Sequence, residues 1–366
     1  MAKSILFSPG PVMSDDSVRY ALLHHDVCHR APEFEGAFAE TLELIKKLFK
    51  ADDSYQAVIV SGSGTSANEC VLSSATKEGE RVMLIRNGMF GERLQEILEK
   101  HQIPYDDVEF PWGTKPDLAV IEEAMKNSDA VLVAMVCHES STGMLNPIHD
   151  VGALAKKYGK RFFIDTVSAA GGEYIDVVND NVDIAVSVGG KCLGAYPGSA
   201  YVCAKKDFLD SLTEDQCKTI YLNLYRHYHY AVDKNQTPNT PNTTLVWALK
   251  KALENVIEEG VDNYIERHIK MTNIIRNGVK EMGLRFLLPE EEMGHTITNV
   301  FLPEGIDLAA FIDKIEERGY TNYPGKGDYA AQGMFAIGTM GAITEGDCYG
   351  YLGTLKEVLK EMGYDC

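Results

Sequence analysis

Two residues near the middle of the chain have the type and the position to do chemistry. Asp165 directly follows the apolar run 161–164, and Lys191 follows a second apolar run, 184–187, with flanking glycines that are expected to clear space around it. The carboxyl ends of parallel strands are where α/β sheets present functional groups. There, a carboxylate can pair with a protonated ring nitrogen. A partly desolvated lysine has a lowered pKa and can offer a neutral amine for a Schiff base.

Both residues also have an ordinary structural interpretation. Asp165 can be the N-cap of the next segment, since Asp is common at that position. Lys191 can be a solvated loop lysine, and its neighbouring glycines are then only turn residues. A third feature is needed to choose between these interpretations.

That feature is the segment 61–67, which reads Ser-Gly-Ser-Gly-Thr-Ser-Ala. It follows a predicted strand and opens a predicted helix, so backbone N–H groups and the hydroxyls of Ser63 and Thr65 can converge at a helix N-terminus and hold a phosphate. An ordinary strand-to-helix turn is equally consistent with this segment. It is not a P-loop, because no Gly-Lys-Ser/Thr follows, and it lacks the third glycine of a dinucleotide fingerprint.

The order and spacing of the three features are more specific than any one of them. Lys191 lies 26 residues after Asp165, about one strand–helix–strand step, and the segment 61–67 precedes both. Pyridoxal 5′-phosphate needs a phosphate site, an acidic partner for its ring nitrogen and a lysine for its aldehyde. The sequence therefore predicts a pyridoxal phosphate site with Asp165 and Lys191 as its catalytic residues.

The elements that must position these residues alternate along the first part of the chain. Short apolar runs, typical of buried strands, alternate with amphipathic segments such as 91–100 and 150–158, which predicts an α/β fold with a mostly parallel sheet. The predicted strands cover residues 57–60, 82–85, 130–136, 161–164 and 184–187.

The pattern changes after about residue 245 to longer helices mixed with a few strands. We expect a large α/β domain with an N-terminal arm at 1–250 and a smaller α+β domain at 251–366. The predicted helices are 245–259, 261–282, 308–318 and 348–362, and the predicted strands are 296–302 and 334–338.

Composition limits the partners of the protein. The 366 residues are 45% hydrophobic and 24% charged, which is typical of a globular protein and excludes a disordered or collagen-like chain. The net charge of −19 disfavours nucleic acid and anionic membranes, so an anionic substrate needs a local positive site. Residues 1–11 lack a signal-peptide core, and the eight cysteines are scattered without a CxxC pair, so reduced thiols and a cytoplasmic location are expected.

Several motifs carry a resemblance that runs nearly from end to end. With them, the chain resembles the class V aminotransferases, which are fold-type I pyridoxal phosphate enzymes, and among these the 2-aminoethylphosphonate:pyruvate transaminases. One motif, at 28–34, instead resembles the alanine/serine:glyoxylate branch. The other motifs are Ser-Pro-Gly-Pro at 8–11, Gly-Ser-Gly-Thr at 62–65, Asn-Gly-Met-Phe-Gly at 87–91, His-Glu-Ser-Ser-Thr-Gly at 138–143, Asp-Thr-Val-Ser at 165–168, Lys-Cys-Leu at 191–193, Thr-Pro at 240–241 and Tyr-Pro-Gly-Lys at 323–326.

The resemblance implies which residues hold the phosphate end of the cofactor. Ser63, Gly64 and Thr65 are implied to bind the phosphate, and Thr240 is implied to reach it from the partner subunit. A homodimer with active sites at its interface is therefore expected.

The resemblance also assigns residues to the ring. Phe90 is implied to stack on one face of the pyridine and Val167 to pack on the other, while Ser140 hydrogen-bonds the ring hydroxyl. Asp165 partners the ring nitrogen, and Lys191 binds the cofactor covalently and transfers protons during the reaction. The implied activity moves an amino group from 2-aminoethylphosphonate or an amino acid to a 2-oxo acid such as pyruvate or glyoxylate.

One position departs from the family pattern. Where the family has an arginine that binds the substrate carboxylate as a bidentate pair, this chain has Ala336. Either another cation replaces it, or the usual amino acid is not the substrate. The replacement candidates are Arg30, Arg93, Arg226 and Lys326.

The missing arginine also motivates alternatives to transamination. A pyridoxal phosphate lyase or decarboxylase of the same fold is one, and a binding protein without turnover is another, less favoured because Asp165 and Lys191 are both present. No metal site is predicted: the segment 24–29 contains three histidines, but adjacent residues are not expected to face one ion. Likewise, the aromatic-rich segment 226–230 is interpreted as interface packing.

Overall fold

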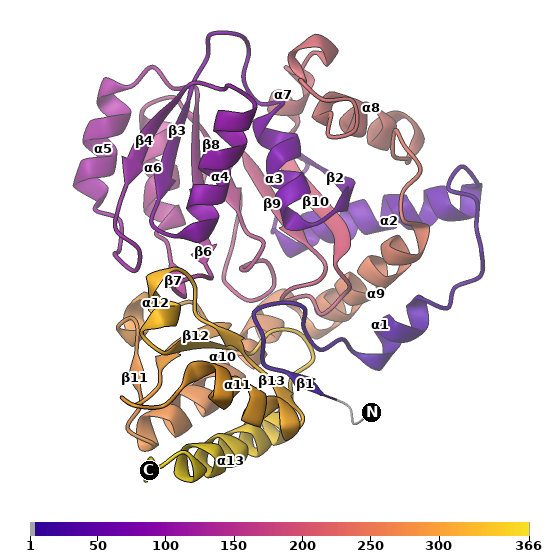
Figure 1. The fold of residues 1–366 in the computed structure, drawn as a ribbon. Coiled ribbons are helices and arrows are strands. Elements are labelled where there is room, and N and C mark those ends of the chain that lie inside the picture. Colours follow the sequence, from indigo (N-terminus) through magenta and orange to yellow (C-terminus); the bar gives the residue numbers. More distant parts are fainter. Residues whose placement is uncertain (1–3, 366) are drawn as a thin grey trace.

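A seven-stranded sheet forms the centre of the larger part of the molecule in the computed structural model, which describes residues 4–365 (Figure 1). Strand β10 is antiparallel to both of its neighbours, and the other pairings are parallel. The α/β fold with a mostly parallel sheet is thus confirmed. In spatial order the strands are β2 (Tyr55–Gly62), β10 (Gly198–Lys205), β9 (Ile184–Val188), β8 (Arg161–Asp165), β5 (Leu132–Val136), β3 (Val82–Arg86) and β4 (Tyr105–Glu109).

The central strands are buried on both faces because helices pack against the sheet. Every residue of β5 and β9 is buried, which explains why their sequences are continuous apolar runs instead of alternating ones. The helices of this part are α1 (Asp16–Ala21), α2 (Pro32–Leu48), α3 (Gly64–Leu72), α4 (Met89–Lys100), α5 (Leu118–Asn127), α6 (Ile148–Lys157), α7 (Lys206–Asp210), α8 (Leu224–Lys234) and α9 (Thr243–Glu259), with a 3-10 turn η1 (Glu214–Gln216) and a small hairpin of β6 (His138–Glu139) and β7 (Met144–Leu145).

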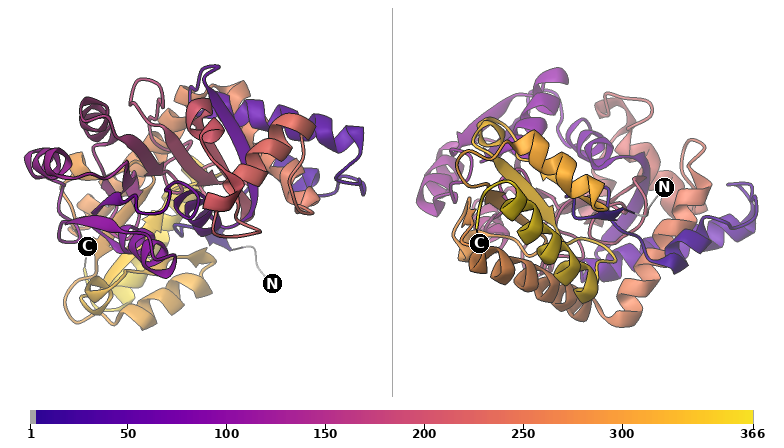
Figure 2. Two further views of the ribbon diagram at one scale, coloured as in Figure 1. Left: turned by 90° about the horizontal axis from the view of Figure 1, so that it is seen from above. Right: turned by 60° about the horizontal axis from the view of Figure 1, so that its bottom comes forward.

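The C-terminal part is an antiparallel sheet whose helices gather on one side (Figure 2, right). Side chains alternate along its strands: Val300, Phe335 and Ile337 join the core formed with the helices, whereas Asn299 and Ala336 point the other way, towards the larger part. Its sheet order is β11 (Arg285–Phe286), β12 (Ile297–Phe301), β15 (Met334–Gly338) and β14 (Tyr323–Pro324), and its helices are α10 (Val261–Glu281), α11 (Leu308–Glu317), α12 (Asp328–Ala331) and α13 (Glu345–Glu361), with a 3-10 turn η2 (Glu290–Glu292).

The N-terminal segment crosses to this smaller part. Strand β1 (Ile5–Leu6) pairs in parallel with β13 (Tyr320–Thr321), and Phe7 is fully buried in the smaller core. The larger core extends along the chain as far as Tyr264 on α10. The predicted division at residue 250 stays a prediction, but the N-terminal segment is placed so that residues 9 and 10 reach the candidate site.

The remaining features concern the surface and the cysteines. Within residues 4–365, no helix combines the length and the apolar character needed to cross a membrane. The seven cysteines in that range are free thiols, and all but Cys28 are buried.

Candidate active site

Asp165 lies buried at the carboxyl end of β8, in the middle of the large sheet. One of its carboxylate oxygens accepts the backbone N–H of Val167 at 2.8 Å, and the other accepts the Nδ2 of Asn68 at 2.6 Å. Burial raises the pKa of Asp165, while these two hydrogen bonds and the charge of Lys191 oppose the rise. The carboxylate is therefore fixed in orientation and near one cation.

The glycine-rich segment forms the turn that was predicted between a strand and a helix. Helix α3 begins at Gly64 with Ser63 as its N-cap, and the exposed Ser63 hydroxyl makes no capping hydrogen bond. A Cβ at Gly64 would lie 2.4 Å from the Cγ2 of Val167, so only glycine lets the helix start pack against the loop that follows Asp165. The structure thus places Gly64 against Val167, two residues after Asp165.

Lys191 extends from the loop after β9 towards the N-terminal segment, where its Nζ donates to the backbone carbonyl of Pro9. Burial lowers the pKa of Lys191, and the charge of Lys326 lowers it further, while Asp165 and Cys192 act in the opposite direction. A lysine in this setting loses its proton more readily than one in water.

The glycine that gives this lysine room is a distant one. A Cβ at Gly10 would lie 2.7 Å from the Nζ of Lys191. The adjacent Gly189 and Gly190 instead face Ser199 and Pro197, where a Cβ would lie 2.7 Å and 2.6 Å from the nearest atoms. The sequence interpretation that the flanking glycines clear space around Lys191 is therefore wrong, because they make room for the following loop.

The buried carboxylate of Glu139 links the two segments that carry Phe90 and Ser140. Glu139 accepts the backbone N–H groups of Phe90 at 3.1 Å and Gly91 at 3.0 Å, and the hydroxyl of Ser141 at 2.5 Å. These bonds join the hairpin that carries Ser140 to the first turn of α4. Burial raises the pKa of Glu139, and the hydrogen bonds oppose that rise. Glu139 thereby fixes where the Phe90 ring stands.

A cavity of about 200 Å³ joins these elements. Phe90, Ser140 and Lys191 line it from the larger part, and Pro9 and Gly10 line it from the N-terminal segment. Its remaining wall comes from the smaller sheet, with Asn299, Tyr323, Lys326 and Ala336 among the lining residues. The cavity therefore lies between the two sheets, and residues from both parts of the molecule line it.

The lining of the cavity shows which of the four predicted replacement cations lies at the site. Of the four candidates, Lys326 alone lines the cavity among the residues described. Arg30 donates to Gln236 and to the carbonyl of Thr237, Arg93 pairs with Glu96, and Arg226 pairs with Glu214.

Of the predicted site residues, Phe90, Ser140 and Lys191 line this cavity, whereas Asp165, Val167 and the glycine-rich turn are not among its lining residues. Thr240 does not line it either. It is exposed in the loop before α9, and a nearby residue of this loop, Asn242, donates its backbone N–H to the Ser61 hydroxyl at 3.3 Å. The loop therefore lies at the same end of β2 as the glycine-rich turn.

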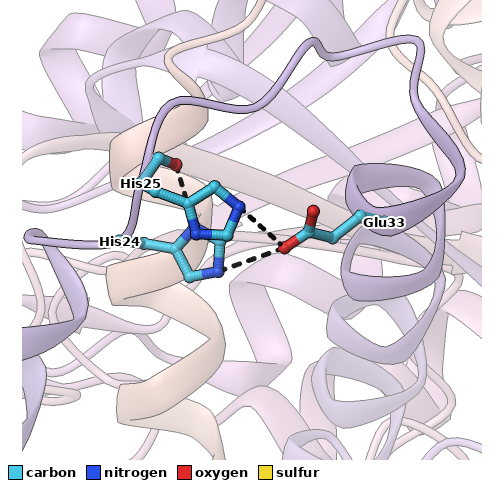
Figure 3. Close-up of side chains that lie close together, drawn as sticks. All are labelled: His24, His25 and Glu33. Atoms are coloured by element: carbon cyan, nitrogen blue, oxygen red, sulfur yellow. Dashed lines mark hydrogen bonds and ion pairs between the residues drawn. The ribbon is translucent and has the colours of Figure 1, made fainter.

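Two of the histidines at 24–29 do converge on one carboxylate (Figure 3). The Nε2 atoms of His24 and His25 lie 3.5 and 3.3 Å from Glu33 Oε1. The His24 ring also stacks on Trp247 with 3.8 Å between ring centroids. These two adjacent histidines thus share one carboxylate, although the residues of this segment were not all expected to face one ion, and the absence of a metal site stays a prediction.

Three residues of the site were not singled out from the sequence. Asn68 is one turn into α3 and reads as an ordinary helical residue, and Asn299 reads as a polar residue of a half-buried strand. Glu139 stands within the motif at 138–143, directly before Ser140, and an acidic residue two positions after the apolar run 130–137 was the available signal.

Comparison with known proteins agrees with this geometry. The family model Aminotransferase class-V matches residues 15–320. An uncharacterized aminotransferase of Methanocaldococcus jannaschii is 31% identical, covering 99% of this chain and 94% of its own. The 2-aminoethylphosphonate–pyruvate transaminase of Klebsiella pneumoniae is also 31% identical, covering 97% of each chain.

A solved structure extends the similarity to three dimensions. The ureidoglycine–glyoxylate aminotransferase of Bacillus subtilis superimposes with a TM-score of 0.94 at 27% identity, covering 100% of this chain and 96% of that one. These relatives favour amino-group transfer over the lyase or decarboxylase alternative. The chain belongs to the class V aminotransferases and is a pyridoxal phosphate-dependent enzyme of fold type I.

Proposed function

We propose that the elements around Asp165 hold pyridoxal phosphate. The residues fit the group: the Asp165 carboxylate is buried and oriented, Lys191 is close enough to influence its pKa, and Gly64 leaves the space that Val167 fills. Asp165 would partner the ring nitrogen and Lys191 would bind the aldehyde carbon. Asn68 supports this arrangement, because its Oδ1 is buried without a partner while its Nδ2 holds Asp165.

The other predicted contacts follow from where their residues lie. Ser63 and Thr65, with the backbone N–H groups at the start of α3, would bind the phosphate. Phe90 would stack on the ring from the α4 side, with Val167 on the opposite face and Ser140 near the ring hydroxyl. These assignments rest on the positions of the residues and on the family resemblance.

The reaction that we propose transfers an amino group from a small anionic amine to a 2-oxo acid. When bound, the cofactor supplies an electron sink for the charge left on the substrate carbon. The Nζ of Lys191, with its lowered pKa, would be suited to take a proton from that carbon and to hold it for return. Asp165 keeps the ring-nitrogen proton in place throughout.

The amine donor that we favour is 2-aminoethylphosphonate or an amino acid, with pyruvate or glyoxylate as acceptor. The Klebsiella relative supports the phosphonate and pyruvate, and the Bacillus structure supports glyoxylate. A screen of single half-reactions with the holoenzyme tests this: 2-aminoethylphosphonate, alanine and serine are each mixed with it and the cofactor absorbance is followed. Absence of amino-group transfer with every anionic donor would refute the proposal.

We also propose a homodimer in which Thr240 approaches the phosphate of the partner subunit. Exposed apolar side chains support such an interface, including Tyr20, Leu23 and Ile220, each at least 70% exposed. The test mixes a Lys191→Ala variant with a Thr240→Ala variant. A shared site predicts that mixed dimers regain wild-type cofactor affinity in one site, whereas a site built from one chain predicts no gain.

The location that we propose is the cytoplasm. The buried free thiols support it, because such cysteines persist unpaired in a reducing compartment. Fractionation of cells that produce the protein would test this location.

A further inference from the structure

The position of the missing arginine is the middle of a row of three residues. In the smaller sheet, Ala336 on β15 is directly opposite Asn299 on β12 and directly opposite Tyr323 on β14. Residues directly opposite each other in an antiparallel sheet present their side chains on the same face. All three line the cavity that contains Lys191. A group occupying the space above Ala336 therefore has the Asn299 side chain on one side and the Tyr323 strand on the other.

Asn299 is a polar side chain with nothing to bind. It is only 2% exposed, and its Nδ2 has no hydrogen-bond partner within residues 4–365. Leaving a buried amide donor unpaired is costly, and such groups are rare in folded proteins. Rotation about the bond to its amide carbon can turn either the donor or the acceptor towards a group in the cavity. The side chain is thus suited to a ligand.

Lys326 supplies the charge at the same wall. Within the described chain its ammonium group makes no ion pair, and the nearest aromatic ring, that of Tyr323, has its centroid 5.9 Å away. Lys191 and Lys326 line the cavity, and no Asp or Glu of the described residues does so. In a chain of net charge −19, a cavity with two cations and no carboxylate is a local positive site.

We propose that Asn299 and Lys326 form the subsite that receives the anionic head group of the substrates in place of an arginine fork. This proposal rests on the proposed transamination and names the specificity-determining residues for its substrates. Lys326 contributes a point charge and Asn299 one hydrogen bond, while Ala336 leaves the space between them free. Two separately placed donors do not demand the planar geometry that a guanidinium demands. The subsite therefore takes a tetrahedral phosphonate as well as a planar carboxylate.

The direct test measures binding of the head group alone. Methylphosphonate and acetate are titrated into the holoenzyme by calorimetry, with wild type, Lys326→Met and Asn299→Asp compared. Losing a hydrogen bond to a charged group weakens binding by about tenfold or more, so we expect that loss for Lys326→Met. Asn299→Asp has the same shape but adds a negative charge, so it too should weaken binding of both anions relative to wild type.

Matched variants separate this role from a structural one. Lys356 is exposed on α13 and makes no ion pair in the described residues, so Lys356→Met should bind both anions as wild type does. Lys326→Arg keeps the charge and should retain binding within a few-fold. Turnover of 1-aminopropane, which carries no anionic group, should fall less in Lys326→Met than turnover of 2-aminoethylphosphonate does.

Equal dissociation constants for wild type, Lys326→Met and Asn299→Asp would overturn the proposal. Equal losses in Lys326→Met and Lys356→Met would overturn it as well, since the effect would then be one of overall charge. Failure of the transamination proposal looks different: wild type would then transfer no amino group from any donor, whatever the anion titrations show.

Discussion

The two sides of the cavity differ in whether their polar groups already have hydrogen-bond partners. Behind the residues that line it from the larger part, Asp165 has both carboxylate oxygens hydrogen-bonded, and Glu139 accepts backbone N–H groups at the start of α4. On the wall from the smaller sheet, Asn299 and Lys326 have no such partners among the residues described. A wall whose groups are already satisfied can hold a fixed cofactor, whereas unsatisfied groups are available to the changing substrates.

Removing the lysine of the first wall should have the largest effect. Lys191→Ala loses both the covalent partner and the proton carrier, so turnover should fall by about 10⁴-fold or more. Borohydride reduction of wild-type holoenzyme followed by peptide mapping should place the label on Lys191. A Lys115→Ala variant, which changes an exposed lysine, serves as control. A label on another lysine would contradict the assignment.

Neutralising the Asp165 carboxylate should have the second largest effect. Asp165→Asn keeps the shape but cannot stabilise a protonated ring nitrogen, and we expect turnover to fall by about 10²- to 10⁴-fold with the fold retained. Steady-state kinetics together with thermal unfolding measure the two quantities separately. Turnover close to that of wild type would show that the ring nitrogen has a different partner.

Restoring the arginine of the second wall should shift specificity more than rate. Ala336→Arg fills the space beside Asn299 and offers a planar fork, which suits a carboxylate better than a phosphonate. We expect the ratio of kcat/KM for alanine to that for 2-aminoethylphosphonate to rise by about tenfold. Ala336→Leu, which fills the same space without charge, is the control. An unchanged ratio would mean that the head group binds elsewhere.

The smallest expected effect concerns a contact between the larger and smaller parts outside the cavity lining. His295, just before β12, pairs with the buried Glu173 of the larger part through Nδ1 at 2.6 Å. The hydrogen bond to Glu173 raises the pKa of His295 above 6.5, with burial and Arg276 opposing and Glu266 supporting the rise.

Since the folded-state pKa is the higher one, this pair stabilises the fold fully below pH 6.5, and the contribution is lost as pH rises through the raised value. His295→Gln should therefore lower the free energy of unfolding by less than about 1 kcal/mol near pH 6, because the side chain is one-third exposed and screened. Chemical denaturation of both proteins near pH 6 and near pH 9 checks this. A difference that grows with pH would contradict it.

The first wall could be predicted from the sequence and the second only in part, since Ala336 and Lys326 were named but Asn299 was not. Asp165 and Lys191 follow apolar runs, and the periodicity of those runs already shows that the two residues stand at one edge of a parallel sheet. The contact between Gly10 and Lys191 joins residues 181 positions apart, and the row through Asn299, Ala336 and Tyr323 depends on strand register. Neither leaves a local pattern in the sequence.

We infer that the larger part supplies the catalytic groups, Lys191 and Asp165, and that Lys326 and Asn299 of the smaller part recognise the anion. The most direct test of this inference is a single-turnover half-reaction of 2-aminoethylphosphonate with wild-type and Lys326→Met holoenzyme, following cofactor absorbance over a range of donor concentrations. We expect the half-saturating concentration of 2-aminoethylphosphonate to rise by about tenfold or more in Lys326→Met, while the limiting rate stays within a few-fold of wild type. A limiting rate that falls by orders of magnitude with an unchanged half-saturating concentration would contradict it.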